Sequence, residues 1–226
     1  MDPMQPPPYA FGDTLYVFAL SGLRLRAFDG SVAGLIPYGS QIIVEGYRVN
    51  ERQDTIENIP GYWPQTTWKG VRGYVFDGFL SWLPPPETDI KDIASYAERY
   101  FKRVGDCGNY IYKGTEIELN FLESSENAEA YSYQITMTFK WSDLDEKDMY
   151  LLMRALFRDE IKSSLAEFKK EDTLWYEDEN HTKKAGQDFF RFARGKKAGS
   201  YEAPVGFFLD YGNCFLGAYI AFGFAD

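Results

Sequence analysis

The sequence predicts an all-β N-terminal third followed by an α+β domain, and two observations carry this prediction. The chain has 226 residues, and 18% of them are aromatic, a composition that favours β-rich packing. Short runs that alternate apolar and polar residues fill positions 13–83, whereas positions 89–226 mix such runs with stretches of helical periodicity. Three prolines, Pro84 to Pro86, separate the two parts and predict a stiff, extended linker.

Three short sequence motifs indicate the strands and turns of the N-terminal third. In Gly22–Arg26 (GLRLR) the leucines and arginines alternate, so they point to opposite faces of a strand. Leu35–Gly39 (LIPYG) reads as a turn, and Gly73–Leu80 (GYVFDGFL) follows a Lys-Gly turn between two short aromatic strands. In this order and spacing the three motifs resemble those of the bacterial SH3-like domain. The resemblance implies a small β-barrel over residues 13–83. Val49–Gly61 is a polar insertion longer than a tight turn requires.

The expected organisation is therefore a proline-rich tail at 1–12, the barrel at 13–83, a linker at 84–88 and an α+β domain at 89–226. Thr88 or Asp89 is expected to cap a first helix that ends at Gly105, because apolar residues recur there at three- and four-residue steps. Alternation in Thr115–Leu122 and Tyr131–Trp141 predicts two antiparallel strands, each with one buried and one wet face, joined by a hairpin loop at Ser124–Asn127.

A long second helix is expected from Asp143, which forms a capping-box-like start with Glu146, to about Lys170. Four extended segments then follow. The last has apolar residues at both odd and even positions, as in a central strand that is covered on both faces. The sheet of this domain is expected to be antiparallel, with the helices packed on one of its faces. The four segments are Leu174–Glu177, Phe189–Ala193, Val205–Leu209 and Phe215–Phe224.

The formal net charge is −10, of which −2 falls on residues 1–86 and −8 on residues 87–226. An acidic surface repels phosphates and anionic head groups, so we expect neither nucleic acid nor an anionic membrane as a partner. No apolar run approaches the ~18 residues of a membrane span. Met1–Pro8 lacks the pattern of a signal peptide. The chain is thus either extracytoplasmic with its signal removed, which the SH3-like resemblance favours, or cytoplasmic.

The two cysteines, Cys107 and Cys214, both lie beside turn residues. They are either two small buried thiols or, in an exported protein, a disulfide. Cys107 lies in Asp-Cys-Gly-Asn, which resembles the start of the NlpC-type cell-wall cysteine peptidases, with His181 as the implied base. An alternating strand follows Cys107, which leaves no room for the nucleophile's helix, and His181 sits in a charged loop. The peptidase is therefore the alternative interpretation.

The sequence favours binding over catalysis. One histidine and two scattered cysteines lack metal-ligand spacing, and no cofactor motif is present. The N-terminal third has more aromatic residues than a small barrel can bury, so some are expected at its surface. We predict Tyr47, Trp63, Trp68 and Tyr74 as ligand-contacting residues. The expected function is a non-enzymatic binding or scaffolding protein of the bacterial envelope, whose barrel recognises a peptide, a peptidoglycan-like ligand or a protein partner.

Overall fold

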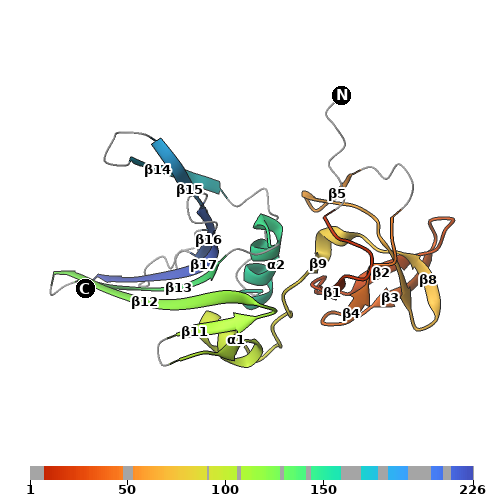
Figure 1. The fold of residues 1–226 in the computed structure, drawn as a ribbon, viewed down its shortest axis with the longest axis horizontal. Coiled ribbons are helices and arrows are strands. Elements are labelled where there is room, and N and C mark those ends of the chain that lie inside the picture. The colour runs from red at the N-terminus through yellow and green to blue at the C-terminus, as the bar shows by residue number, and fades with distance from the viewer. Residues whose placement is uncertain are drawn as a thin grey trace. The chain divides into compact units, whose positions relative to one another are not determined.

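The chain divides into two compact units, Met1–Glu87 and Thr88–Asp226, whose elements are drawn in Figure 1. The computed structural model describes residues 8–47, 53–90, 92–105, 108–127, 130–140, 144–158, 169–177, 183–192, 205–210 and 215–225.

The described residues of the first unit form three antiparallel sheets of short strands and one 3₁₀ helix. One sheet has the order β4-β1-β9, a second has the order β3-β2-β8-β7, and β5 pairs with β6 alone. The elements are β1 (Thr14–Val17), β2 (Leu23–Arg26), β3 (Val32–Ile36), β4 (Gln41–Ile43), β5 (Asp54–Ile56), β6 (Ile59–Gly61), β7 (Gln65–Trp68), β8 (Val71–Tyr74), η1 (Asp77–Phe79) and β9 (Leu80–Ser81).

The core of the first unit follows from alternation along these strands. In β2, Leu23 and Leu25 are buried while Arg24 is exposed and Arg26 half-buried, as the sequence predicted. Between β7 and β8 the positive φ angles of Lys69 (49°) and Gly70 (80°) make the predicted tight turn. The fully buried apolar side chains of this unit include Leu15, Val17, Ile36, Val44, Ile59, Val75 and Leu80.

The predicted closed SH3-like barrel over residues 13–83 is wrong, because the strands lie in separate sheets. Among the described residues, β2 and β8 are paired at one position, Arg26 and Tyr74. An added Cβ on Gly73 would collide with the backbone oxygen of Arg26, so the two strands pass too closely there for any larger residue. The polar insertion also adds a sheet of its own, since Asp54–Ile56 and Ile59–Gly61 form a hairpin.

The second unit is built on one eight-stranded antiparallel sheet with the order β10-β11-β12-β13-β17-β16-β15-β14 (Figure 1). β17 lies between β13 and β16, so its predicted interior position is confirmed. The strands are β10 (Lys102–Arg103), β11 (Asn109–Tyr112), β12 (Thr115–Asn127), β13 (Ala130–Lys140), β14 (Lys169–Glu177), β15 (Lys183–Phe192), β16 (Val205–Asp210) and β17 (Phe215–Ala225).

The predicted α+β domain, with helices packed on one face of its sheet, is contradicted by how little of the unit is helical. The described residues contain two short helices, α1 (Ile93–Tyr100) and α2 (Glu146–Leu156), beside eight strands. α1 begins later than predicted, because the side chain of Asp92 caps it by accepting the backbone N–H of Ser95 at 2.8 Å. Neither helix has the length and apolar character to cross a membrane.

The second helix was predicted too long at both ends. Its capping box uses Asp145 and Asp148 rather than Asp143 and Glu146. It stops at Leu156, and Lys169 already belongs to a strand. The apolar periodicity at Ile161, Leu165 and Phe168 that suggested a longer helix lies outside the described residues.

The predicted hairpin loop at Ser124–Asn127 is also wrong, because these residues continue β12 and pair with β13. Ser and Asn are common in turns, but the eleven-residue β13 runs antiparallel beside this segment and supplies backbone partners. The connection therefore falls after Asn127, and the hairpin is longer than the alternation alone indicated.

α2 lies against β16 and β17, and its apolar stripe is buried as predicted. Met149, Leu152, Met153 and Leu156 lie on this stripe. The sheet residues expected to face it, Ile135 and Phe139, lie on β13, and their side chains are outside the described set. The described burial shows that α2 is a core element of the second unit.

Leu156→Ala should lower the free energy of unfolding by about 2–5 kcal/mol, because it removes a buried side chain and leaves a cavity. Val104→Ala is the control in the same unit, since Val104 is 42% exposed, and it should cost at most about 0.5 kcal/mol. Urea unfolding of the full chain, followed by circular dichroism, measures both. Equal losses for the two variants would contradict the core position of α2.

Candidate functional site

Asp77 is a buried carboxylate that joins distant segments of the first unit. Its Oδ1 accepts the backbone N–H of Tyr62 at 2.6 Å, and its Oδ2 accepts the hydroxyl of Tyr47 at 3.3 Å. A Cβ added to Gly61 would lie 2.7 Å from Asp77 Oδ1 and 2.7 Å from the backbone nitrogen of Gly78. Only glycine therefore allows β6 to approach this carboxylate so closely, and the carboxylate is satisfied by that approach.

Tyr47 is half-buried and packs edge-on against Tyr62, with the ring centroids 6.3 Å apart. Burial raises the pKa of the Tyr47 phenol well above its ordinary value, and the negative charge of Asp77 raises it further. The phenol therefore stays protonated and remains a hydrogen-bond donor to Asp77. Its polar atom faces the interior of the unit.

Trp63 is held on several sides. Its indole Nε1 donates to Asp54 Oδ2 at 3.1 Å, so the hairpin formed by the insertion fixes the ring. Its ring lies 5.4 Å from that of Phe76, and the guanidinium of Arg26 lies 5.5 Å from its centroid. A guanidinium over an indole is a favourable cation–π contact. Trp63 thus supports Arg26 while its own ring is half-buried.

Tyr74 lies next to Arg26 in the sheet and is only 6% exposed. Its hydroxyl accepts the Nε2 group of Gln65 at 2.9 Å, and its ring meets that of Phe28 edge-on at 5.4 Å. Phe28 is itself 58% exposed. The accessible aromatic surface at this place therefore belongs to Phe28 rather than to Tyr74.

Trp68 lies apart from this cluster, at the end of β7 beside the tight turn. The ammonium of Lys69 lies 5.9 Å from the centroid of its ring, and Val71 is its neighbour across the hairpin. The structure thus brings Trp63 and Tyr74 together around Arg26. It links Tyr47 to them through Tyr62 and leaves Trp68 separate. Their role in ligand binding stays a prediction.

The outer side of the four-stranded sheet carries two arginines beside exposed apolar residues. Arg24 pairs with Leu35 across β2 and β3, and Arg26 pairs with Val32, so each pair shares one face. Leu35 and Val32 are more than half exposed. We call this surface the arginine face. It consists of Arg24, Arg26, Phe28, Val32 and Leu35.

Sequence reasoning placed Arg24 and Arg26 opposite the core leucines but did not include them in the site. The signal was the alternation itself, because two arginines on one side of a strand next to Leu35 and Val32 form a mixed basic and apolar patch. Asp54 and Asp77 were missed for a different reason. Tyr47 lies 30 residues from Asp77, and Trp63 reaches Asp54 only because the β5–β6 hairpin folds back on itself, so no short sequence motif indicates either pair.

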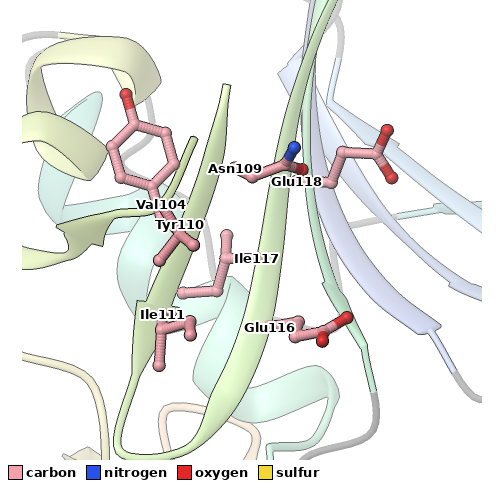
Figure 2. Close-up of a pocket in the computed structure, with 7 residues that line it drawn as sticks. All are labelled: Val104, Asn109, Tyr110, Ile111, Glu116, Ile117 and Glu118. Carbon is pink, nitrogen blue, oxygen red and sulfur yellow. The ribbon is translucent and has the colours of Figure 1, made fainter. Parts of the chain in front are cut away.

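The second unit has a shallow pocket of about 280 Å³ beside β11 and β12 (Figure 2). Glu116 and Glu118 extend from β12 at separate heights, whereas Ile111 and Val104 supply exposed apolar surface. The Cα atoms of residues two apart on a strand are about 6.5–7 Å apart, and Figure 2 shows that the carboxylates of Glu116 and Glu118 lie apart from each other. The lining residues are Val104, Asn109, Tyr110, Ile111, Glu116, Ile117 and Glu118.

The predicted peptidase pair, Cys107 and His181, and the possible disulfide between Cys107 and Cys214 lie outside the described residues. Neither prediction is therefore decided by the geometry. Within the described part of the chain, no group of three or more His, Cys, Asp or Glu side chains could hold a metal ion.

Comparisons with known proteins do not assign a family. No protein-family model matches the chain, and no curated protein matches it. Among solved structures, the chain is similar to the acyl-CoA thioesterase II TesB2 from Mycobacterium marinum, with 12% identity and a TM-score of 0.22. The match covers 98% of this chain and 82% of that one. A likeness this weak carries no argument about fold or activity.

Tyr47→Phe should lower the free energy of unfolding by about 1–2 kcal/mol near neutral pH, because it removes the hydrogen bond to Asp77. The folded-state pKa of Tyr47 is raised, so this stabilisation is fully present below its ordinary value of 10.0 and is lost as the pH rises above it. The difference between wild type and variant should thus narrow above about pH 10. Urea unfolding across this range tests it, and a difference that widens would contradict the assignment.

Trp63→Ala should lower the free energy of unfolding by about 2–4 kcal/mol, because Asp54, Phe76 and Arg26 all lose a partner. Trp68→Ala, at the end of the hairpin, should cost less than about 1 kcal/mol. Thermal and urea unfolding of both variants give the comparison. Equal large losses would show that both tryptophans are structural and that neither is available as a ligand anchor.

Proposed function

We propose that the first unit is a non-enzymatic binding module, and that the arginine face docks an extended peptide. The peptide belongs either to the cell wall or to a protein partner in the bacterial envelope. The observation that carries the proposal is the pairing of Arg24 and Arg26 on β2 with the exposed Leu35 and Val32 on β3, close to the exposed ring of Phe28, which contacts Tyr74.

The chemistry of the face suits a peptide. A guanidinium donates to carbonyl or carboxylate oxygens in a fixed planar geometry, while Phe28, Val32 and Leu35 offer apolar surface to side chains or methylene stems. Exposed aromatic and arginine side chains are also the types that most often dominate binding energy. An extended ligand matches a sheet surface because its side chains repeat at the spacing of the strand below it.

Neighbouring groups fix the orientation of Arg26 in the arginine face. Arg26 is held over Trp63 and also donates to the backbone oxygen of Gly30 at 3.0 Å. Trp63 is in turn held by Asp54. An arginine that is already oriented loses less side-chain entropy when a ligand binds.

The placement in the envelope has a separate basis. It is supported by the resemblance of three segments to sequence motifs of bacterial SH3-like domains, and not by the arrangement of the sheets. The segments are Gly22–Arg26, Leu35–Gly39 and Gly73–Leu80. The cysteine-peptidase alternative depends on Cys107 and His181, about which the described residues say nothing.

Phe28→Ala should weaken binding at least about tenfold, because it removes an exposed aromatic contact. It should change the free energy of unfolding by less than about 1 kcal/mol. Phe11→Ala is the matched control, since Phe11 is 81% exposed and precedes β1, which belongs to a different sheet. Binding is measured by sedimentation with purified peptidoglycan and by pulldown from envelope extracts, with and without muramidase digestion.

Retention by peptidoglycan that disappears with Phe28→Ala and survives Phe11→Ala would place the ligand in the cell wall. A captured protein that survives muramidase treatment and shows the same dependence would place it in a partner. Equal binding by the two variants, or no binding of the wild type in either assay, would overturn the proposal.

A further inference from the structure

Arg24 and Arg26 are held differently, although both lie on the same side of β2. Arg26 contacts Trp63 and Gly30. Arg24 is exposed, and among the described residues it forms no hydrogen bond or ion pair. Arg72, on the neighbouring β8, is already engaged, since its guanidinium lies 3.2 Å from Glu45 and donates to Gln65 at 3.0 Å. The strand therefore presents one supported cation and one cation that is free to bind.

The spacing of the two cations fits an extended ligand. Residues two apart on a strand lie about 6.5–7 Å from each other, and the same repeat separates alternate side chains of an extended peptide. A carboxylate at every second position of such a peptide could reach both guanidinium groups at once. Leu35 and Val32, the neighbours of Arg24 and Arg26 on β3, would contact the methylene groups of glutamate side chains.

The acidic groups around the face are occupied. Asp29 accepts the backbone N–H and the hydroxyl of Ser31 at 2.9 and 2.6 Å. Asp54 accepts the indole N–H of Trp63. Neither forms an ion pair with an arginine of the face in the described part of the chain. Hydrogen bonds from neutral donors leave both carboxylates charged, but within the described residues neither contacts a guanidinium of the face, so Arg24 remains available to an acidic ligand.

We propose that the ligand of the arginine face is an acidic, extended segment of a protein partner with glutamates at alternate positions, and that Arg24 determines this specificity. The inference rests on the binding module proposed above and adds the chemical class of its ligand. Charge complementarity favours a short acidic segment over a nucleic acid, because a long polyphosphate would also meet the net negative charge of the remaining chain.

Fluorescence anisotropy with labelled nine-residue peptides tests this in the full chain. The first peptide has Glu at three alternate positions among Thr and Val, the second has Gln at those positions, and the third has three Glu at every third position. The alternate-Glu peptide should bind at least about tenfold more tightly than the other two. Its affinity should fall as NaCl is raised from about 50 to about 500 mM.

Arg24→Gln should weaken binding of the alternate-Glu peptide about five- to tenfold and leave the affinity for the Gln peptide unchanged. Arg24→Lys should restore part of the loss, since it keeps the charge without the planar donor geometry. Arg103→Gln, an exposed arginine of β10 in the other unit, is the control and should have no effect.

The outcomes separate this inference from the proposed function. Equal affinity for the Glu and Gln peptides, or no loss with Arg24→Gln, would overturn the acidic-ligand inference. The binding module would still be supported if Phe28→Ala weakens binding to peptidoglycan or to a captured partner. Binding of an oligonucleotide as tight as that of the alternate-Glu peptide would also overturn the inference. Failure of all peptides, peptidoglycan and extracts would overturn both.

Discussion

The buried carboxylate of Asp77 is the interaction on which the first unit depends. It accepts from Tyr47, which precedes the insertion, and from Tyr62, which follows it, so one side chain fixes both ends of the inserted segment. Gly61 permits the approach because any larger residue would displace the carboxylate or the backbone of Gly78. A buried carboxylate with these partners is satisfied, and without them it would be strongly unfavourable.

A chain of contacts leads from this carboxylate to the surface. Because the insertion is fixed at both ends, its β5–β6 hairpin places Asp54 within hydrogen-bond distance of Trp63. Trp63 then supports the guanidinium of Arg26, which emerges on the outer side of the sheet. The insertion therefore acts as a brace for the arginine face rather than as a loop that carries the ligand contacts itself. Binding surfaces gain affinity from such pre-organisation as well as from direct contacts.

Local patterns in the sequence predicted the elements whose structure depends on neighbouring residues. The alternation in Leu23–Arg26 and the turn at Lys69-Gly70 were found as expected. The segment Phe215–Phe224 was also correctly predicted as an interior strand, because its apolar residues at both odd and even positions indicate burial on both faces without identifying the partner strands. Predictions that required distant pairing were wrong. Whether the sheets close into a barrel depends on how far β2 and β8 run together. In the described part of the chain they pair at one position, Arg26 and Tyr74, and no local sequence pattern indicates this.

In the candidate site, too, local sequence patterns did not predict the contacts between distant residues. An excess of aromatic residues suggested that Tyr47, Trp63, Trp68 and Tyr74 contribute to the surface, but these side chains are buried or half-buried, and the exposed aromatic side chain near them is Phe28. The pattern could not show which rings turn inward, because Tyr47 is drawn toward Asp77 and Tyr74 is covered by its neighbours Phe28 and Gln65. Hydrogen-bond partners decided the orientation of these side chains, and those partners are far away in the sequence.

Net charge and local charge act on a ligand at different distances. At physiological ionic strength, exposed charges more than about 8 Å apart are largely screened, so a short segment bound on the arginine face responds mainly to Arg24 and Arg26. A long polyanion extends beyond that distance, so it also responds to the net charge of the whole chain, which is −10. The same acidic composition that leaves the short ligand unaffected therefore discriminates against the long one. Specificity of this kind needs both the attractive pair on β2 and the repulsion around it.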